Sequence, residues 1–86
     1  SLIYLLKKVK KNMCYPVSIN SIKDIERFNK VATEQDFNMY ISCDNILVDV
    51  KSILAMFALL GKSGVIVAPD HANPKAFLKA LKKMGV

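Results

Sequence analysis

Several residue types are scarce in this chain of 86 residues, and each scarcity excludes a class of protein. There is no tryptophan, one histidine and two cysteines, Cys14 and Cys43, which make neither a CxxC pair nor a disulfide framework. Because His71 stands alone, with no ligand-type spacing of cysteine, histidine and acids, we expect no metal and no cofactor. We expect the two thiols to be reduced and to pack as small hydrophobic groups.

Long apolar runs are also missing, although 52% of the residues are hydrophobic. The apolar stretch Ser52–Gly61 is far shorter than the about 20 residues that a membrane-spanning helix requires. A secretory leader carries its basic residues before its apolar core, whereas Leu2–Leu6 here precede the first lysines. We therefore expect one soluble, cytoplasmic domain without a transmembrane segment.

Acidic residues are fewer than basic ones, 7 against 13, which gives a formal net charge of +6. The excess lies at the two ends, because residues 1–13 and residues 75–86 each contain four lysines and no acid. The stretch between them is slightly acidic and has no basic patch interleaved with stacking aromatic residues. We therefore expect no nucleic-acid binding.

The N-terminal lysines belong to a pattern that predicts a basic amphipathic helix over residues 1–13, ahead of a domain at 14–86. Its apolar residues recur at helical spacing, at Leu2, Leu5, Leu6, Val9 and Met13. Three interpretations of this extension stay open. It docks on the domain or on another copy, which would give a homo-oligomer; it is mobile or foreign to the natural chain; or it binds an anionic membrane.

Hydrophobic periodicity predicts four strands and three helices in residues 14–86. The strands are expected at Tyr15–Ile19, Phe37–Cys43, Ile46–Val50 and Gly64–Ala68. Pro16 suits an edge strand, and Asp44-Asn45 suits a two-residue hairpin that pairs Cys43 with Ile46 and Ile41 with Val48. The order β-α-β-β-α-β-α is typical of an α+β open-faced sandwich, an antiparallel sheet with helices on one face.

Capping residues mark the start of each helix. Ser21, followed by Asp24, opens the first, whose inward residues are expected to be Ile22, Ile25, Phe28 and Ala32. Ser52 is expected to cap a second helix, Ile53–Leu60, which is apolar nearly all round and which Gly61 closes. The surplus apolar flank of this helix indicates a partner surface. Asn73 and Pro74 open the last helix, whose inward residues are expected to be Phe77, Ala80, Leu81 and Met84.

The segment Val48-Asp49-Val50-Lys51-Ser52-Ile53, followed by Leu59, Gly64 and the helix Ala76–Leu81, resembles the HPr family. These are the phosphocarrier proteins of the bacterial sugar phosphotransferase system. The resemblance runs from about Tyr15 to Met84 and implies the HPr-like fold, no enzymatic activity, and protein partners of the phosphotransferase or carbon-regulation type. The N-terminal basic helix lies outside the family pattern.

The carrier chemistry of the family uses a histidine in a Gly-(Leu/Ile)-His-Ala-Arg-Pro motif, which this chain lacks. Counting back without gaps from Lys51-Ser52-Ile53 puts Ser21 at the histidine position, Lys23 at the arginine and Asp24 at the proline. A serine hydroxyl without a neighbouring base does not replace imidazole in a reversible phosphoryl relay. The resemblance therefore implies a divergent member without carrier chemistry. An active carrier that uses His71 or Ser21 as its acceptor stays open as the alternative.

Ser52 matches the serine that an ATP-dependent kinase phosphorylates in Gram-positive members of the family. Phosphate on Ser52 would lie at the start of a helix beside Lys51, and Leu54 and Phe57 fall at positions where family members contact partners. Two interpretations stay open for Ser52, capping alone or regulatory phosphorylation. The expected function is a regulatory or protein-binding module, with a structural, oligomerising protein as a further alternative.

Overall fold

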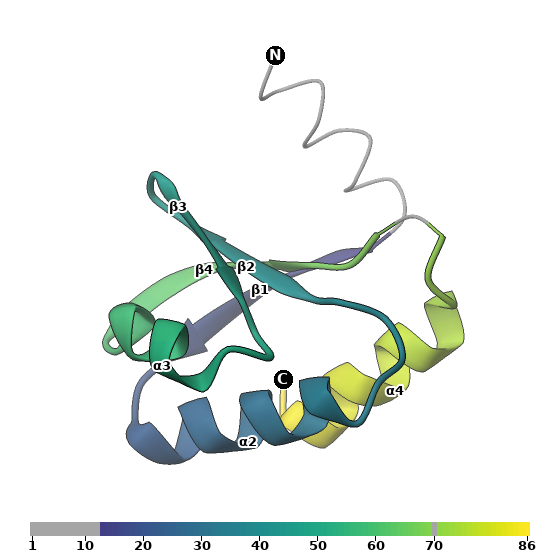
Figure 1. Ribbon diagram of the computed structural model, residues 1–86, viewed down its shortest axis with the longest axis horizontal. Coiled ribbons are helices and arrows are strands. Elements are labelled where there is room, and N and C mark those ends of the chain that lie inside the picture. Colours follow the sequence, from purple (N-terminus) through teal and green to yellow (C-terminus); the bar gives the residue numbers. More distant parts are fainter. Residues whose placement is uncertain (1–12, 70) are drawn as a thin grey trace.

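The computed structural model describes residues 13–69 and 71–86 (Figure 1). Its elements are β1 (Cys14–Ile19), α2 (Ile22–Thr33), β2 (Tyr40–Cys43), β3 (Ile46–Asp49), α3 (Ile53–Met56), the 3-10 helix η1 (Phe57–Leu59), β4 (Lys62–Val67) and α4 (Pro74–Met84). This is the predicted order for the α+β domain. The predicted N-terminal helix lies outside the described residues.

The four strands form one antiparallel sheet in the order β1-β4-β2-β3. β1 lies at an edge, where the missing N–H of Pro16 costs no hydrogen bond to a second neighbour. The predicted hairpin register is confirmed, since Cys43 pairs with Ile46 and Ile41 with Val48. Asp44 takes the left-handed conformation of the turn, with φ 52°.

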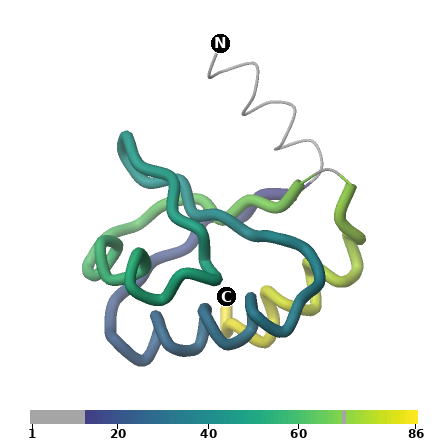
Figure 2. The backbone as a smooth tube through the Cα atoms, in the orientation of Figure 1, coloured from purple at the N-terminus to yellow at the C-terminus, as the bar shows by residue number. Residues whose placement is uncertain are grey.

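The helices cover one face of the sheet and enclose the core against it. Figure 2 shows α2 and α4 crossing beneath the sheet in opposite directions, with α3 at one end. Phe28 and Ile25 of α2 are buried against the strands, and the four residues of α4 predicted to face inward are all buried. Met13, just before β1, is 2% exposed, and its carbonyl oxygen accepts a hydrogen bond from Ala68 N–H at 3.1 Å.

The predicted helix over Ile53–Leu60 is wrong in its length. The α-helical part ends at Met56, and the chain continues as a single 3-10 turn. Gly61 then takes φ +79°, and its N–H donates to the carbonyl oxygen of Ile19 at 2.6 Å. This bond to the end of β1 draws the chain back into the sheet, which explains why the last turn tightens rather than continuing as α-helix.

Three further predictions need correction. Ile22 is 53% exposed, because it is the first residue of α2 and lies beyond the cover of the sheet. β2 begins at Tyr40 rather than Phe37. Phe37 and Met39 are both buried, but of the two only Met39 makes a backbone hydrogen bond to the next strand segment, where its carbonyl oxygen accepts the N–H of Val50. β4 begins two residues early, at Lys62, because the long partner β1 extends the ladder to Ile19.

The described residues contain no helix that is long and apolar enough to cross a membrane. Both cysteines are free thiols, Cys14 half-buried and Cys43 buried. Within residues 13–69 and 71–86, no cluster of histidine, cysteine and acidic side chains could hold a metal ion.

Candidate functional site

The start of α2 is closed by a complete capping box. Ser21 is the N-cap, and its Oγ accepts the backbone N–H of Asp24 at 3.2 Å. In return, Oδ2 of Asp24 accepts the backbone N–H groups of Asn20 at 2.9 Å and Ser21 at 3.1 Å. The predicted cap is therefore confirmed, and each partner satisfies backbone donors that the first helical turn cannot use itself.

Arg27 connects the start of α2 to the C-terminal end of α4. Its Nη2 donates to Oδ1 of Asp24 at 2.6 Å, and its Nε donates to the carbonyl oxygen of Met84 at 2.7 Å. The hydrogen bond from Asn20 N–H is the main cause that holds the pKa of Asp24 below its ordinary value of 3.8, and Arg27 lowers it further. The carboxylate of Asp24 is therefore charged in the folded protein near neutral pH.

α3 begins at the same end of the molecule as α2 and contacts it (Figure 1). The predicted cap at Ser52 is wrong, since this residue occupies the N-cap position but its side chain makes no capping hydrogen bond. The preceding turn is held by Asp49 instead, whose Oδ1 accepts from Lys51 N–H and whose carbonyl oxygen accepts from Ser52 N–H, both at 2.9 Å. The exposed hydroxyl of Ser52 therefore has no role in holding the helix start.

Lys51 is half-buried, and its amino group is already engaged. Its Nζ donates to the carbonyl oxygen of Gln35 at 3.0 Å, just beyond the C-terminal end of α2. Beside it, Asn29 Nδ2 donates to the carbonyl oxygen of Val50 at 3.0 Å. These two bonds attach the β3–α3 connection to α2 and so fix where Ser52 stands. No local pattern in the sequence indicates either of them.

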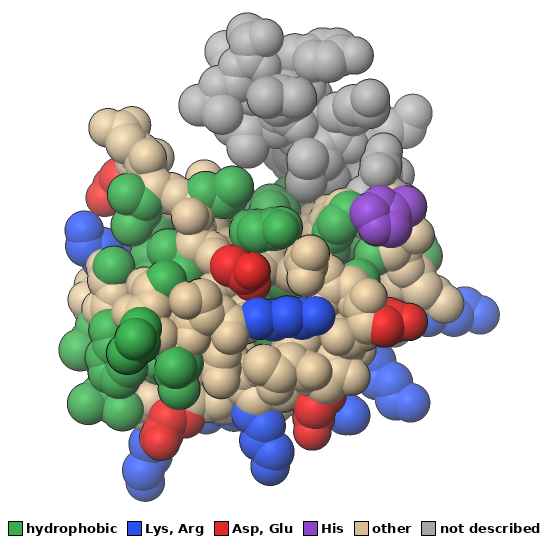
Figure 3. Space-filling model, viewed as in Figure 1, with side chains coloured by type: hydrophobic (Ala, Val, Ile, Leu, Met, Phe, Trp, Pro, Cys, Tyr) green, Lys and Arg blue, Asp and Glu red, His purple; other side chains and the backbone are tan. Residues whose placement is uncertain are grey.

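Exposed apolar side chains surround the two helix starts, and we call them the apolar surface. They are Ile22, Ile53, Leu54, Phe57 and Leu60. Leu54 is 82% exposed and Phe57 42%, whereas Met56 and Leu59 of the same segment are buried in the core. Figure 3 shows apolar side chains gathered at this end of the molecule, over α3. The predicted surplus flank therefore exists, and it is wider than Leu54 and Phe57 alone.

His71 does not join this group. It lies in the turn before α4, and Figure 3 shows the histidine at the opposite end of the molecule from α3. Lys23 is exposed on the first turn of α2, near Ser21 in sequence. The structure therefore brings together Ser21, Asp24 and the apolar surface, and it leaves the only histidine remote from them.

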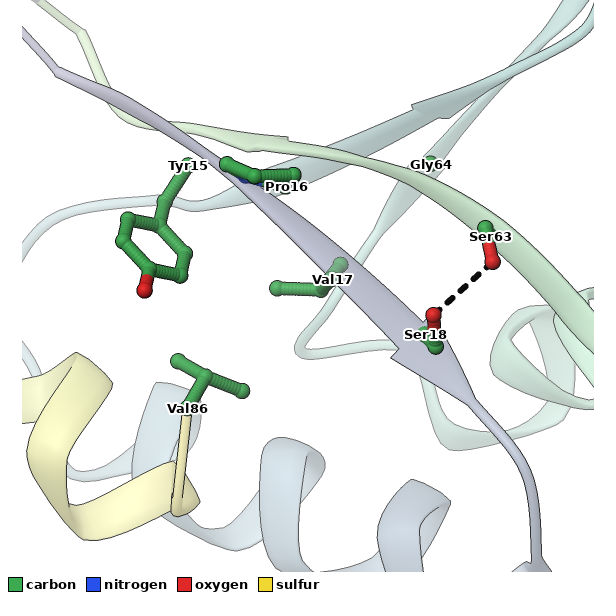
Figure 4. A pocket seen from close by; sticks show the side chains of 7 residues that line it. All are labelled: Tyr15, Pro16, Val17, Ser18, Ser63, Gly64 and Val86. Atoms are coloured by element: carbon green, nitrogen blue, oxygen red, sulfur yellow. Dashed lines mark hydrogen bonds between the residues drawn. The ribbon is translucent and has the colours of Figure 1, made fainter.

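A pocket of about 550 Å³ opens at the β1 edge of the sheet (Figure 4). It is lined by Tyr15, Pro16, Val17, Ser18, Ser63, Gly64 and Val86. The hydroxyls of Ser18 and Ser63 bond to each other at 2.8 Å, and the lining contains no histidine, lysine or acid. Lining side chains without a base or a charge offer no activated nucleophile, so this pocket is a poor candidate for an active site.

Solved structures with the same fold are found at low sequence identity. HPr-C-His from Thermoanaerobacter tengcongensis has a TM-score of 0.65 and 20% identity, over 85% of this chain and 96% of that chain. The histidine-containing phosphocarrier protein of Mycoplasma gives 0.63 and 15%, over 83% of this chain and 89% of that one. The phosphocarrier protein HPr of Bacillus anthracis has a TM-score of 0.60 and 18% identity, over 83% of this chain and 89% of that chain.

Comparison at the level of sequence adds nothing to this likeness. No protein-family model matches the chain, and neither does any curated protein. The similarity is thus one of architecture, across nearly the whole length of the solved proteins. The described domain has the fold of the HPr phosphocarrier proteins.

Proposed function

We propose that this chain is a divergent, cytoplasmic HPr-like protein of the phosphotransferase system that does not relay phosphate through histidine. It is not an enzyme, and it acts as a regulatory or protein-binding module through Ser52 and the apolar surface. Its partners are proteins of the phosphotransferase or carbon-regulation type. The observation that carries this proposal is the Asp24 carboxylate, which closes the start of α2.

A phosphoryl group at a helix start is held by free backbone N–H groups and by the positive end of the helix dipole. Here the N–H groups of Asn20 and Ser21 donate to Asp24, and the N–H of Asp24 donates to Ser21 Oγ. An incoming phosphate would have to displace these bonds and would also face the negative charge of the carboxylate. Both effects oppose a carrier site at this position.

The available acceptors also argue against a relay. The hydroxyl oxygen of Ser21 accepts the backbone N–H of Asp24. Among the described residues, no histidine or lysine is hydrogen-bonded to this hydroxyl, so none is placed to act as the base that removes its proton. His71 lies at the opposite end of the molecule, away from Ser21 and the apolar surface. A transfer through either residue would therefore lack the positioned base or the surrounding site that phosphoryl transfer requires.

The apolar surface supports a binding role. Leu54 and Phe57 stand at the positions that the family resemblance assigns to partner contacts, and Ile53 and Leu60 extend the same surface. Large apolar side chains that are grouped and exposed are typical of a protein interface, since leaving them in water is unfavourable. An apolar partner surface of similar size would bury them.

The free hydroxyl of Ser52 supports regulation at the rim of this surface. It is exposed and makes no cap bond, so a kinase could modify it without unwinding α3. A phosphate would add about two negative charges next to Ile53 and Leu54, and so would oppose an apolar partner while favouring a basic one. Lys51 could pair with that phosphate only by leaving the carbonyl oxygen of Gln35.

Incubation with phosphoenolpyruvate and enzyme I tests the missing relay. We expect the mass of the protein to stay unchanged, while HPr of Bacillus anthracis in the same mixture becomes phosphorylated. Acid-labile phosphate on this chain would contradict the proposal. The variants Ser21→Ala and His71→Ala would then show which of the two alternative acceptors carries it.

Incubation with the ATP-dependent HPr kinase tests the proposed regulation through Ser52. We expect one acid-stable phosphate, read by mass spectrometry, that is absent from Ser52→Ala. Leu54→Glu should lower kcat/KM of this phosphorylation, whereas Leu78→Glu should not, because Leu78 is an exposed leucine on α4, outside the apolar surface. No phosphorylation, or an equal effect of both variants, would contradict the role given to this surface.

The oligomerising alternative concerns residues 1–13, whose pattern could join two copies. Sedimentation of the full chain over a range of concentrations tests it. A monomer at all concentrations rejects a homo-oligomer, whereas a concentration-dependent dimer that Leu5→Gln/Leu6→Gln abolishes would support it over the regulatory module.

A further inference from the structure

The helix α4 contains four lysines and no acidic residue. All four are exposed, and we call them the lysine stripe; they are Lys75, Lys79, Lys82 and Lys83. Because residues three and four apart are neighbours on a helix, the stripe forms one continuous row, roughly 12 Å long at about 1.5 Å per residue. Figure 3 shows basic side chains projecting at the lower right of the molecule, where Figure 1 places α4.

The lysine stripe does not serve the stability of α4 itself. Cations are favourable in the last turn of a helix, where Lys82 and Lys83 lie. Lys75, however, stands in the first turn, at the positive end of the helix dipole. Lys79 lies four residues from both Lys75 and Lys83, and like charges at this spacing repel each other. A charge pattern that costs the helix stability indicates a role outside the helix.

The positive charge of the stripe is not neutralised by the described residues. Within residues 13–69 and 71–86, no ion pair or hydrogen bond joins any of the four ammonium groups to another residue. Glu34 lines the same groove of about 250 Å³ as Lys79 and Lys83, between α2 and α4, yet it is not paired with either lysine. An incoming carboxylate would therefore bind these cations without displacing a described ion pair.

We propose that the lysine stripe binds an acidic segment of a partner protein. It is an interaction surface separate from the apolar surface, because α4 begins at the end of the molecule opposite to α3 (Figure 1). A single helix or extended segment can place carboxylates along one row of cations, and such complementary charges favour the encounter of the two proteins.

The surroundings of the stripe favour this narrow occupant over a membrane or a nucleic acid. Glu34 borders the stripe on the side of α2, so a broad anionic surface would also meet this negative charge. Phe77, the only aromatic residue of α4, is buried, so the exposed face of this helix offers no side chain on which a base could stack.

Titration of the isotope-labelled full chain with an acidic peptide tests this binding by NMR. The probe is a helical peptide with glutamates at positions i, i+4, i+7 and i+8, and its control has glutamine at the same positions. In about 0.15 M salt, which screens long-range attraction, we expect the amide signals of residues 75–83 to shift with the glutamate peptide only. Shifts confined to residues 1–12 or to α3, no shift at all, or tighter binding to phosphatidylserine vesicles would overturn the proposal.

Two double variants with the same change in net charge separate the stripe from a general attraction to a basic protein. Lys75→Gln/Lys79→Gln should weaken the binding of the glutamate peptide about fivefold, which corresponds to the loss of two exposed ion pairs. Lys23→Gln/Lys62→Gln, which changes two exposed lysines outside the stripe, should weaken it by less than about twofold. Equal weakening by both variants would overturn the proposal.

Thermal unfolding of the same proteins shows whether the lysines serve α4 instead. Glutamine is about as good a helix former as lysine. Lys75→Gln/Lys79→Gln should therefore relieve the charge repulsion within α4 and raise the Tm by a few degrees, while it weakens peptide binding. A lower Tm in this variant would show that the two lysines stabilise the helix, and it would overturn the argument for an external partner.

Discussion

Replacing Asp24 by asparagine removes one negative charge from the start of α2 and nearly nothing else. Asparagine has the same shape, and its Oδ1 can still accept the backbone N–H groups of Asn20 and Ser21. Its amide nitrogen, however, cannot accept the hydrogen bond that Arg27 donates to the second carboxylate oxygen. At present one oxygen serves Asn20 and Ser21, and the other serves Arg27 at 2.6 Å. The substitution therefore turns the favourable contact with Arg27 into a repulsive meeting of donors.

The expected loss of stability follows from two electrostatic contributions. A carboxylate in the first turn gains about 0.3–1 kcal/mol from the helix dipole. A partly exposed ion pair adds about 0.2–1 kcal/mol; the side chain of Asp24 is 17% exposed and that of Arg27 45%, so solvent screens it incompletely. We expect the free energy of unfolding to fall by about 0.5–2 kcal/mol, with a Tm decrease of about 4–8 °C for each kcal/mol.

The pH dependence has a definite sign. Because the pKa of Asp24 is lower in the folded chain than its ordinary value of 3.8, folding favours the charged form. The stabilisation is complete above that ordinary value, and it is lost as the pH falls through the lower, folded value. The difference between wild type and Asp24→Asn should therefore be largest near neutral pH and should shrink in acid below 3.8.

Urea unfolding followed by circular dichroism over a pH series measures this difference. Asp36→Asn is the matched control, since Asp36 is exposed and has no hydrogen bond or ion pair among the described residues. It should leave stability near its wild-type value throughout. A pH-independent loss in Asp24→Asn, or an equal loss in both variants, would refute the electrostatic account of the helix start.

Three further predictions concern the two helix starts, the close approach of strands at Gly64 and the hydrogen bond from Arg27 to Met84. Ser21→Ala should cost about 1 kcal/mol in urea unfolding, whereas Ser52→Ala should stay within about 0.5 kcal/mol, because only Ser21 makes a cap bond. Gly64→Ala would place a Cβ against a backbone carbonyl oxygen of β2 and should cost about 1–3 kcal/mol, with Gly64→Ser at least as damaging. Arg27→Lys keeps the charge but loses the planar bond to Met84, so amide hydrogen exchange should speed up in the last turn of α4 and stay unchanged in β4.

Local signals in the sequence predicted much of the fold. The alternation on both sides of Asp44-Asn45 fixed the hairpin register, because a slip of one residue would expose the buried set. Asn73 and Pro74 marked the start of α4, and Asn73 Oδ1 accepts Lys75 N–H at 2.9 Å. In each case the residues that make the structure lie within a few positions of one another, so the pattern contains the whole cause.

Predictions failed where the cause is distant in sequence. The hydrogen bond from Gly61 N–H to Ile19 shortens the α-helical part of the segment that begins at Ile53. The hydrogen bond from Arg27 to Met84 connects α2 to the C-terminal end of α4. Neither partner is visible in a local window. Ser52 failed for a related reason: its residue type and position suit a cap, but Asp49 already holds the turn.

The two neighbouring helix starts differ in a way that bears on the proposed function. At α2 the side chain of Asp24 accepts the backbone N–H groups of Asn20 and Ser21 and brings a negative charge, which opposes a bound phosphate. At α3 the serine hydroxyl is left exposed beside the apolar surface, which leaves room for a phosphate attached covalently. A covalent serine phosphate needs no preformed anion site, because a kinase supplies the chemistry. Under the proposed function, phosphate would therefore reach this end of the molecule as a regulatory mark at Ser52 rather than as cargo at Ser21.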